Sequence, residues 1–124
     1  MTVDLRGFGH QESVDLSAST LTASLTAHSG KVVNVLVTST ITLPAVATMH
    51  RYTFRVGQEG ITMTISPNAS DLIAGAGAGS SGAGVDNKDV IFTNQPAGSF
   101  ITLEYGDANG WAIVGALGTF TFEA

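Results

Sequence analysis

The chain has no cysteine and few charged residues, and both shortages limit what it can be. Without cysteine, disulfides and thiolate metal sites are excluded. Asp, Glu, Lys and Arg make up only 12% of the 124 residues, about half the share of an ordinary soluble domain. Ser, Thr, Ala and Gly stand where charge would normally coat a small domain. We therefore expect either a neutral, hydroxyl-rich surface or a surface covered by further copies of the chain, and we favour the second.

Long apolar runs and basic clusters are also lacking. No run approaches the ~18 apolar residues of a membrane helix, so we expect no membrane partner. The first residues show no basic region followed by an apolar stretch, which predicts no secretory signal and synthesis in a cytoplasm. The net charge is −5 and the basic residues are scattered, which argues against a nucleic-acid partner. These basic residues are Arg6, Lys31, Arg51, Arg55 and Lys88.

Helical periodicity is lacking as well, and alternation of apolar and hydroxyl residues takes its place. Successive side chains of a strand point to opposite faces, so this alternation predicts strands with one buried face. Segments 57–60 and 106–110 have the glycines and length of hairpin connections, and Pro44, Pro67 and Pro96 fall between strands. We predict a single all-β domain, an antiparallel sandwich or barrel of about eight short strands. The alternating segments are 21–27, 33–43, 51–56, 61–66, 90–92, 101–105, 111–113 and 120–122.

Two stretches depart from this regular pattern. We predict residues 1–27 to be an irregular N-terminal arm plus a first strand, and residues 28–124 to be the β-domain. The arm is either a fraying end or a segment that docks on a neighbouring molecule. Residues 74–84 are rich in Gly and Ala, which makes them costly to order. We expect a surface loop there, or a loop ordered by close approach to another chain.

Sequence motifs for catalysis and metal binding are matched only by a few residues, without the secondary structure that the motifs require. Residues 77–82 have the spacing of a dinucleotide-binding glycine loop, and Ser80 lies in a segment similar to a nucleophile elbow. Both motifs need a following helix, where this sequence predicts a strand. His10, His28 and His50 are too far apart for a local metal motif. The sequence thus predicts no enzymatic activity, no metal and no cofactor.

Two carboxylates have expected structural roles. Asp71 precedes a short apolar segment and could cap a turn. Glu104 lies on the polar side of its predicted strand, where Arg51 or Arg55 could pair with it across the sheet. Neither arrangement points to acid–base catalysis.

A series of short segments follows one another in a recognisable order. Residues 41–45 read ITLPA and precede the strand at residues 52–54, and residues 71–75 read DLIAG before the Gly/Ala-rich loop. The chain closes with GWAIVG at residues 110–115 and GTF at residues 118–120. This order resembles the small β-domain of tailed-bacteriophage virion surface proteins: capsid decoration (cement) proteins, head fibres and tail-fibre tips.

The resemblance covers about residues 28–122 and implies a homotrimeric, non-enzymatic protein on a virus particle, assembled in the host cytoplasm. The chain is hardly longer than the domain, which favours a decoration protein that binds the major capsid protein over a fibre. The candidate capsid contacts lie in the N-terminal arm and are Leu5, Arg6, Phe8 and His10.

The alternative implied by the same resemblance is a receptor- or glycan-binding tip of a phage fibre. In that case exposed aromatic side chains would stack on sugar rings. The aromatic candidates are Tyr52, Tyr105 and Trp111, although Trp111 also suits a place in the core.

Overall fold

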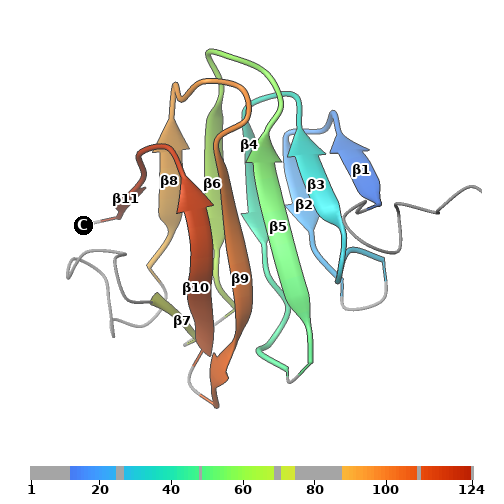
Figure 1. Ribbon diagram of the computed structural model, residues 1–124, viewed down its shortest axis with the longest axis vertical. Coiled ribbons are helices and arrows are strands. Elements are labelled where there is room, and N and C mark those ends of the chain that lie inside the picture. Colours follow the sequence, from blue (N-terminus) through green and yellow to red (C-terminus); the bar gives the residue numbers. More distant parts are fainter. Residues whose placement is uncertain are drawn as a thin grey trace, which may run out of the picture.

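The computed structural model contains strands and no helix within the residues that it describes, and these strands form two sheets (Figure 1). The all-β prediction is therefore confirmed. The candidate capsid contacts Leu5, Arg6, Phe8 and His10, together with residues 75–84 of the Gly/Ala-rich loop, lie outside the described residues. The described residues are 12–24, 27–47, 49–68, 71–74, 88–108 and 110–123.

One sheet has six strands, which range from β1 near the start of the described chain to β10. Its strands are β1 (Ser13–Leu16), β3 (Val32–Val35), β5 (Arg51–Val56), β7 (Leu72–Ala74), β9 (Phe100–Asp107) and β10 (Gly110–Leu117). Their order is β1-β3-β5-β9-β10-β7, from right to left in Figure 1. β1, β3 and β5 are parallel, whereas β9 is antiparallel to β5 and to β10.

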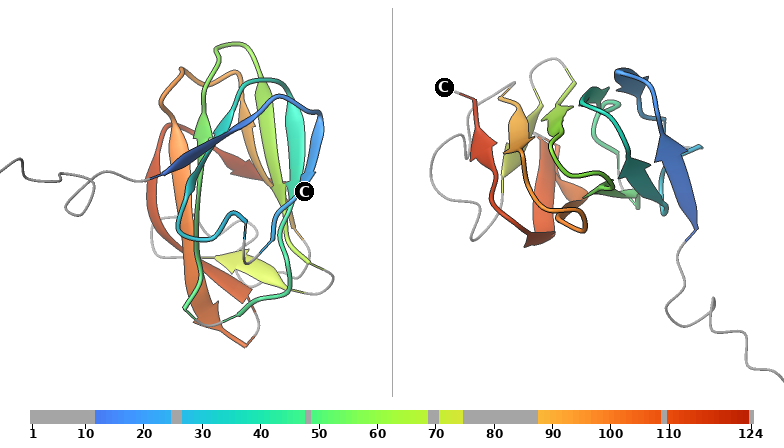
Figure 2. Two further views of the ribbon diagram at one scale, coloured as in Figure 1. Left: turned by 90° about the vertical axis from the view of Figure 1, so that its right-hand side faces the viewer. Right: turned by 90° about the horizontal axis from the view of Figure 1, so that it is seen from above.

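The other sheet has five strands and lies against the first (Figure 2). Its strands are β2 (Thr20–Thr22), β4 (Ser39–Thr42), β6 (Thr62–Ser66), β8 (Val90–Thr93) and β11 (Thr121–Phe122). The order is β11-β8-β6-β4-β2. β2, β4 and β6 are parallel, whereas β8 is antiparallel to β6 and β11.

From β1 to β6 the chain winds as a flattened coil. Consecutive strands alternate between the sheets, and each pairs in parallel with the next strand of its own sheet. Parallel neighbours need a long crossover, usually a helix; here the intervening strand of the other sheet serves instead. Stacked backbone bonds join the corners, such as Leu36 N–H to Leu16 O at 2.9 Å and Gly57 N–H to Val35 O at 2.8 Å. The predicted antiparallel pairing is thus wrong for this coil and for β7 with β10, which are also parallel, and it is right for β8, β9 and β11.

The predicted strand at residues 33–43 is divided in two. Residues 36–38 form a corner that carries the chain from β3 to β4 in the opposite sheet. Ser39 is buried there, and its hydroxyl lies 2.7 Å from Ala18 O and 2.8 Å from Val37 O. The single O–H of Ser39 is shared between these two carbonyls, which lie in corners outside the strand ladders. Odd-numbered residues face inward before and after the corner, so the alternation alone resembles one continuous strand.

The two predicted hairpins have different outcomes. Segment 57–60 joins β5 to β6, which belong to different sheets, so it is a corner of the coil. The turn after β9 does connect two antiparallel neighbours, as predicted. β10 begins at Gly110. Only glycine fits at this position, because a Cβ would collide with the backbone of Leu72 in β7. β1 is a further difference, since Ser13–Leu16 is a strand where we expected an irregular arm.

The core between the sheets consists of the inward-facing residues of both, as the alternation predicts. Tyr52 stacks on Phe54 and meets Trp111 edge-on, with centroids 5.4 Å apart in the second pair. Among the described residues, Tyr52 Oη and Trp111 Nε1 have no hydrogen-bond partner, and burial raises the pKa of Tyr52 to about 12. The largest fully buried side chains are Trp111, Tyr52, Phe54, Phe92, Ile41, Leu43, Met63, Ile65, Ile73, Ile101, Leu103 and Val33.

Candidate functional site: the outer faces of the two sheets

The outer face of the six-stranded sheet carries side chains that bind one another. Parallel pairing places Asn34 between Asp15 of β1 and Arg55 of β5. Asn34 Nδ2 donates to Asp15 Oδ1 at 3.3 Å, and Arg55 donates to Asn34 Oδ1 at 2.7 Å. The amide thus links a negative to a positive side chain across three strands.

Two further pairs join β5 to β9 on the same face. Arg51 and Glu104 form an ion pair with a 3.1 Å N–O distance, which confirms one of the two pairings expected for Glu104. Thr53 and Thr102 share a hydroxyl–hydroxyl hydrogen bond of 2.9 Å. The polar side chains of this face are largely satisfied by their neighbours within the chain.

The outer face of the five-stranded sheet is made almost entirely of threonine. Parallel register aligns Thr20, Thr40 and Thr64 in one row across β2, β4 and β6. We call this surface the threonine face. Its outward residues are Thr20, Thr22, Thr40, Thr42, Thr62, Thr64, Ser66, Ile91, Thr93 and Thr121.

The strands of the threonine face carry no charged residue, and hydroxyls of its central row have no hydrogen-bond partner among the described residues. None of the five strands contains Asp, Glu, Lys or Arg. Within the described part of the chain, the hydroxyls of Thr20, Thr40 and Thr64 have no hydrogen-bond partner. A hydroxyl donates and accepts but does not titrate near neutral pH, so the face suits binding and offers no acid–base group.

The sequence contains a signal for this face that the alternation analysis missed. Thr-Leu-Thr at 20–22, Thr-Ile-Thr at 40–42 and Thr-Ile-Ser at 64–66 repeat the same short pattern. These three segments are the ones that the coil brings into parallel register. The same pattern also occurs at 62–64 and 119–121, so the sequence alone does not show which copies are neighbours.

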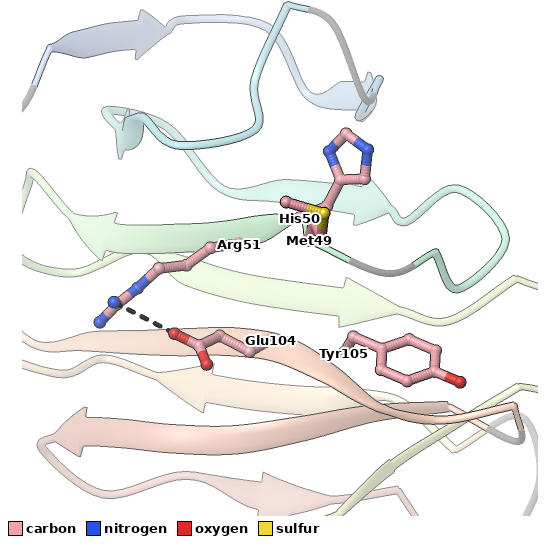
Figure 3. A pocket seen from close by; sticks show the side chains of 5 residues that line it. All are labelled: Met49, His50, Arg51, Glu104 and Tyr105. Carbon is pink, nitrogen blue, oxygen red and sulfur yellow. Dashed lines mark ion pairs between the residues drawn. The ribbon is translucent and has the colours of Figure 1, made fainter.

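A separate depression of about 380 Å³ lies beside the beginning of β5 and the end of β9 (Figure 3). Met49 adopts a left-handed φ of 66° there, and its side chain is 98% exposed. His50 Nδ1 lies 2.9 Å from Ser29 Oγ, which orients the ring. The lining residues are Met49, His50, Arg51, Glu104 and Tyr105.

Of the three aromatic candidates for sugar stacking, only one is accessible. Tyr52 and Trp111 are buried in the core, whereas Tyr105 is 37% exposed at the depression. The expectation that Tyr52 is exposed is therefore wrong, and the place in the core expected for Trp111 is confirmed.

His28 and Asp71 also have partners within the chain. His28 Nδ1 accepts from Ser24 N–H at 3.0 Å, and burial together with the charge of Lys31 lowers the pKa of His28. Asp71 Oδ2 accepts from Val46 N–H at 2.9 Å, so Asp71 anchors the segment after β4. Within the described ranges no group of three or more histidines and carboxylates could hold a metal ion.

The fold and its surfaces define a two-sheet, all-β protein whose two outer faces differ in chemistry. No helix in the described part of the chain is long and apolar enough to cross a membrane. Comparison with protein-family models, curated proteins and solved structures finds no match for this chain.

Proposed function

We propose that this protein is a non-enzymatic structural protein of a tailed-bacteriophage virion that decorates and stabilises the capsid as a homotrimer. It would bind the major capsid protein, lie on the capsid surface and assemble in the host cytoplasm. The threonine face is the observation that carries the proposal. The resemblance of residues 28–122 to phage virion β-domains is the reason for proposing a phage particle as the partner.

The physical case rests on the cost of covering each face. Burying a charged side chain costs several kcal/mol unless it stays paired, and the centres of protein interfaces are accordingly poor in charge. A partner can cover Thr20, Thr40 and Thr64 without desolvating any charge, and it can supply hydrogen bonds to their hydroxyls. A partner on the six-stranded sheet would have to cover the Arg51–Glu104 pair.

The fibre-tip alternative has weaker support. It depends on aromatic side chains that sugars can reach, and Tyr52 and Trp111 are buried. We therefore favour assembly over receptor binding as the main role.

Sedimentation with undecorated capsids of the cognate phage tests the proposal. We expect the protein to co-sediment and to saturate the capsid surface. Light scattering should give the mass of three chains in solution. Absence of capsid binding would overturn the decoration role, and a monomer at micromolar concentration would overturn the trimer.

A charge placed on the threonine face locates the contact. Thr40 lies on β4, between β2 and β6, so Thr40→Lys should abolish trimer formation or capsid binding. Leu117→Lys, at an exposed outward position of β10 in the other sheet, is the matched control and should behave like wild type. If Thr40→Lys assembles and binds normally, the threonine face is not the contact surface.

A further inference from the structure

Two polar groups of the core are not explained by the packing around them. Tyr52 Oη and Trp111 Nε1 are buried, and among the described residues neither atom has a hydrogen-bond partner. The two side chains are 0% and 1% exposed, so bulk solvent does not reach them either. A buried polar group without a hydrogen bond costs free energy, and native cores contain few of them. Two such groups in contact with each other therefore point to a third partner.

The two groups lie on neighbouring rings at one end of the core. Tyr52 belongs to β5 and Trp111 to β10, and β9 runs between these strands (Figure 1). The rings meet edge-on, with their centroids 5.4 Å apart. Trp111 is opposite Tyr105 in the register, and Tyr105 is 37% exposed, so solvent is one residue pair away from the buried rings. A small molecule that enters from this end has both groups within a short distance.

The chemistry of the two groups limits what can bind to them. An indole N–H donates and cannot accept, so the ligand needs an acceptor atom for Trp111. Burial raises the pKa of Tyr52 to about 12, so its hydroxyl keeps its proton at neutral pH and can both donate and accept. A charged ligand would lose its hydration in the core, and an apolar ligand would leave both groups unsatisfied. The edge-on ring contact offers at most a weak N–H···π bond to Trp111 and nothing to the hydroxyl.

We propose that Tyr52 Oη and Trp111 Nε1 together bind one internal water molecule. The water oxygen accepts from Trp111 Nε1, and the same molecule forms a second hydrogen bond with the Tyr52 hydroxyl. Buried waters in proteins bind in this way to polar groups that the chain leaves unsatisfied. A larger neutral ligand would need an opening at which Tyr52 or Trp111 is exposed, and both are buried.

The bound water has a structural role that the backbone ladder does not fill. β5 and β10 are not neighbours, and the water links them across the inner face of β9. The site lies in the core, whereas the proposed assembly uses the threonine face. Failure of the capsid-binding experiment therefore leaves the water site untouched, and the reverse also holds.

A high-resolution crystal structure of the full chain provides the direct test. We expect density for one water oxygen within hydrogen-bonding distance, about 2.7–3.2 Å, of both Trp111 Nε1 and Tyr52 Oη. Clear density for the two side chains without a water that reaches both atoms would overturn the proposal.

Tyr52→Phe distinguishes a bound water from two groups that are simply unsatisfied. The water should leave this variant, because a buried water needs at least two polar partners. Trp111 N–H then loses its acceptor, so the ratio of folded to unfolded chains in urea denaturation should fall about tenfold. If the hydroxyl has no partner in the wild type, its removal relieves a cost of burial. An equal or higher ratio in Tyr52→Phe would therefore contradict the proposal.

Fluorescence reports on the same site, because Trp111 is the one tryptophan of the chain. Loss of the water should move the emission of folded Tyr52→Phe to shorter wavelength, since the indole loses its polar partner. Tyr105→Phe is the matched control, because it removes the hydroxyl of the other tyrosine at an exposed position. It should keep the stability and the emission of the wild type. Unchanged emission in Tyr52→Phe, or an equal shift in Tyr105→Phe, would contradict the proposal.

Discussion

The two sheets have equivalent inner faces and very different outer ones. On the six-stranded sheet, Arg51 binds Glu104 and Arg55 binds Asn34, so polar groups find partners on neighbouring strands. On the five-stranded sheet, Thr20, Thr40 and Thr64 stand in a row without charge or internal partners in the described chain. Both faces follow the same alternation, so core packing does not explain the difference. This difference between the outer faces is our reason for proposing the threonine face as the assembly contact.

Parallel register explains how each face tolerates its residues. Parallel strands place equivalent positions side by side, so a repeated charged residue would set like charges against each other. Threonine avoids this repulsion in the row of Thr20, Thr40 and Thr64. The six-stranded sheet avoids it differently, because the neutral Asn34 separates and bridges Asp15 and Arg55.

The largest expected effect tests whether the inner faces are equivalent. Ile41 and Ile101 are fully buried in opposite sheets. Ile41→Ala and Ile101→Ala should each lower the free energy of unfolding by about 2–5 kcal/mol, because both leave a cavity in one shared core. Urea denaturation measures this. A near-neutral result in either sheet would mean that the two do not share the core equally.

The same substitution on the two outer faces should have unequal effects. Thr53→Val leaves the Thr102 hydroxyl, in a residue only 5% exposed, without its partner, and should cost about 1–3 kcal/mol. Thr40→Val removes a hydroxyl with no internal partner and should change stability by less than about 0.5 kcal/mol. Denaturation at low protein concentration compares the folded chains alone. Equal costs would remove the distinction between the faces.

The smallest expected effect concerns the connection from the five-stranded to the six-stranded sheet. Burial, and then the charge of Lys31, lower the pKa of His28 below its ordinary value of 6.5, and its neutral Nδ1 accepts from Ser24 N–H. As the pH falls below 6.5, the unfolded chain binds the proton first, so stability present above that pH should decline.

Urea denaturation above and below this pH measures the decline. His28→Asn, which lacks the titrating ring, should lose that part of the pH dependence. An unchanged pH profile in the variant would show that His28 does not contribute.

The alternation in the sequence predicted much of the core and part of the depression. It identified the inward residues of β5, β6 and β9, and it suggested the pairing of Glu104 with Arg51 because both lie on the polar sides of their strands. The place of Met49 could not be predicted, since it depends on a left-handed φ in a loop without a pattern. The alternation showed the residues of the threonine face only as separate polar positions. A period of two shows which side of a strand a residue faces, but it does not show which strands are neighbours.

The sequence by itself thus determined that the chain forms strands, and which side of most strands is buried, because alternate side chains must enter or leave water together. Only the tertiary structure decided which strands are neighbours. Residues 57–60 have the glycines of a hairpin, yet the chain crosses there to the opposite sheet, and β5 gains β3 and β9 as partners. Backbone hydrogen bonding is the same for any strand partner, so the choice falls to core packing and corner contacts far apart in sequence. That choice assembled ten outward side chains, nine of them hydroxyl-bearing, into one face.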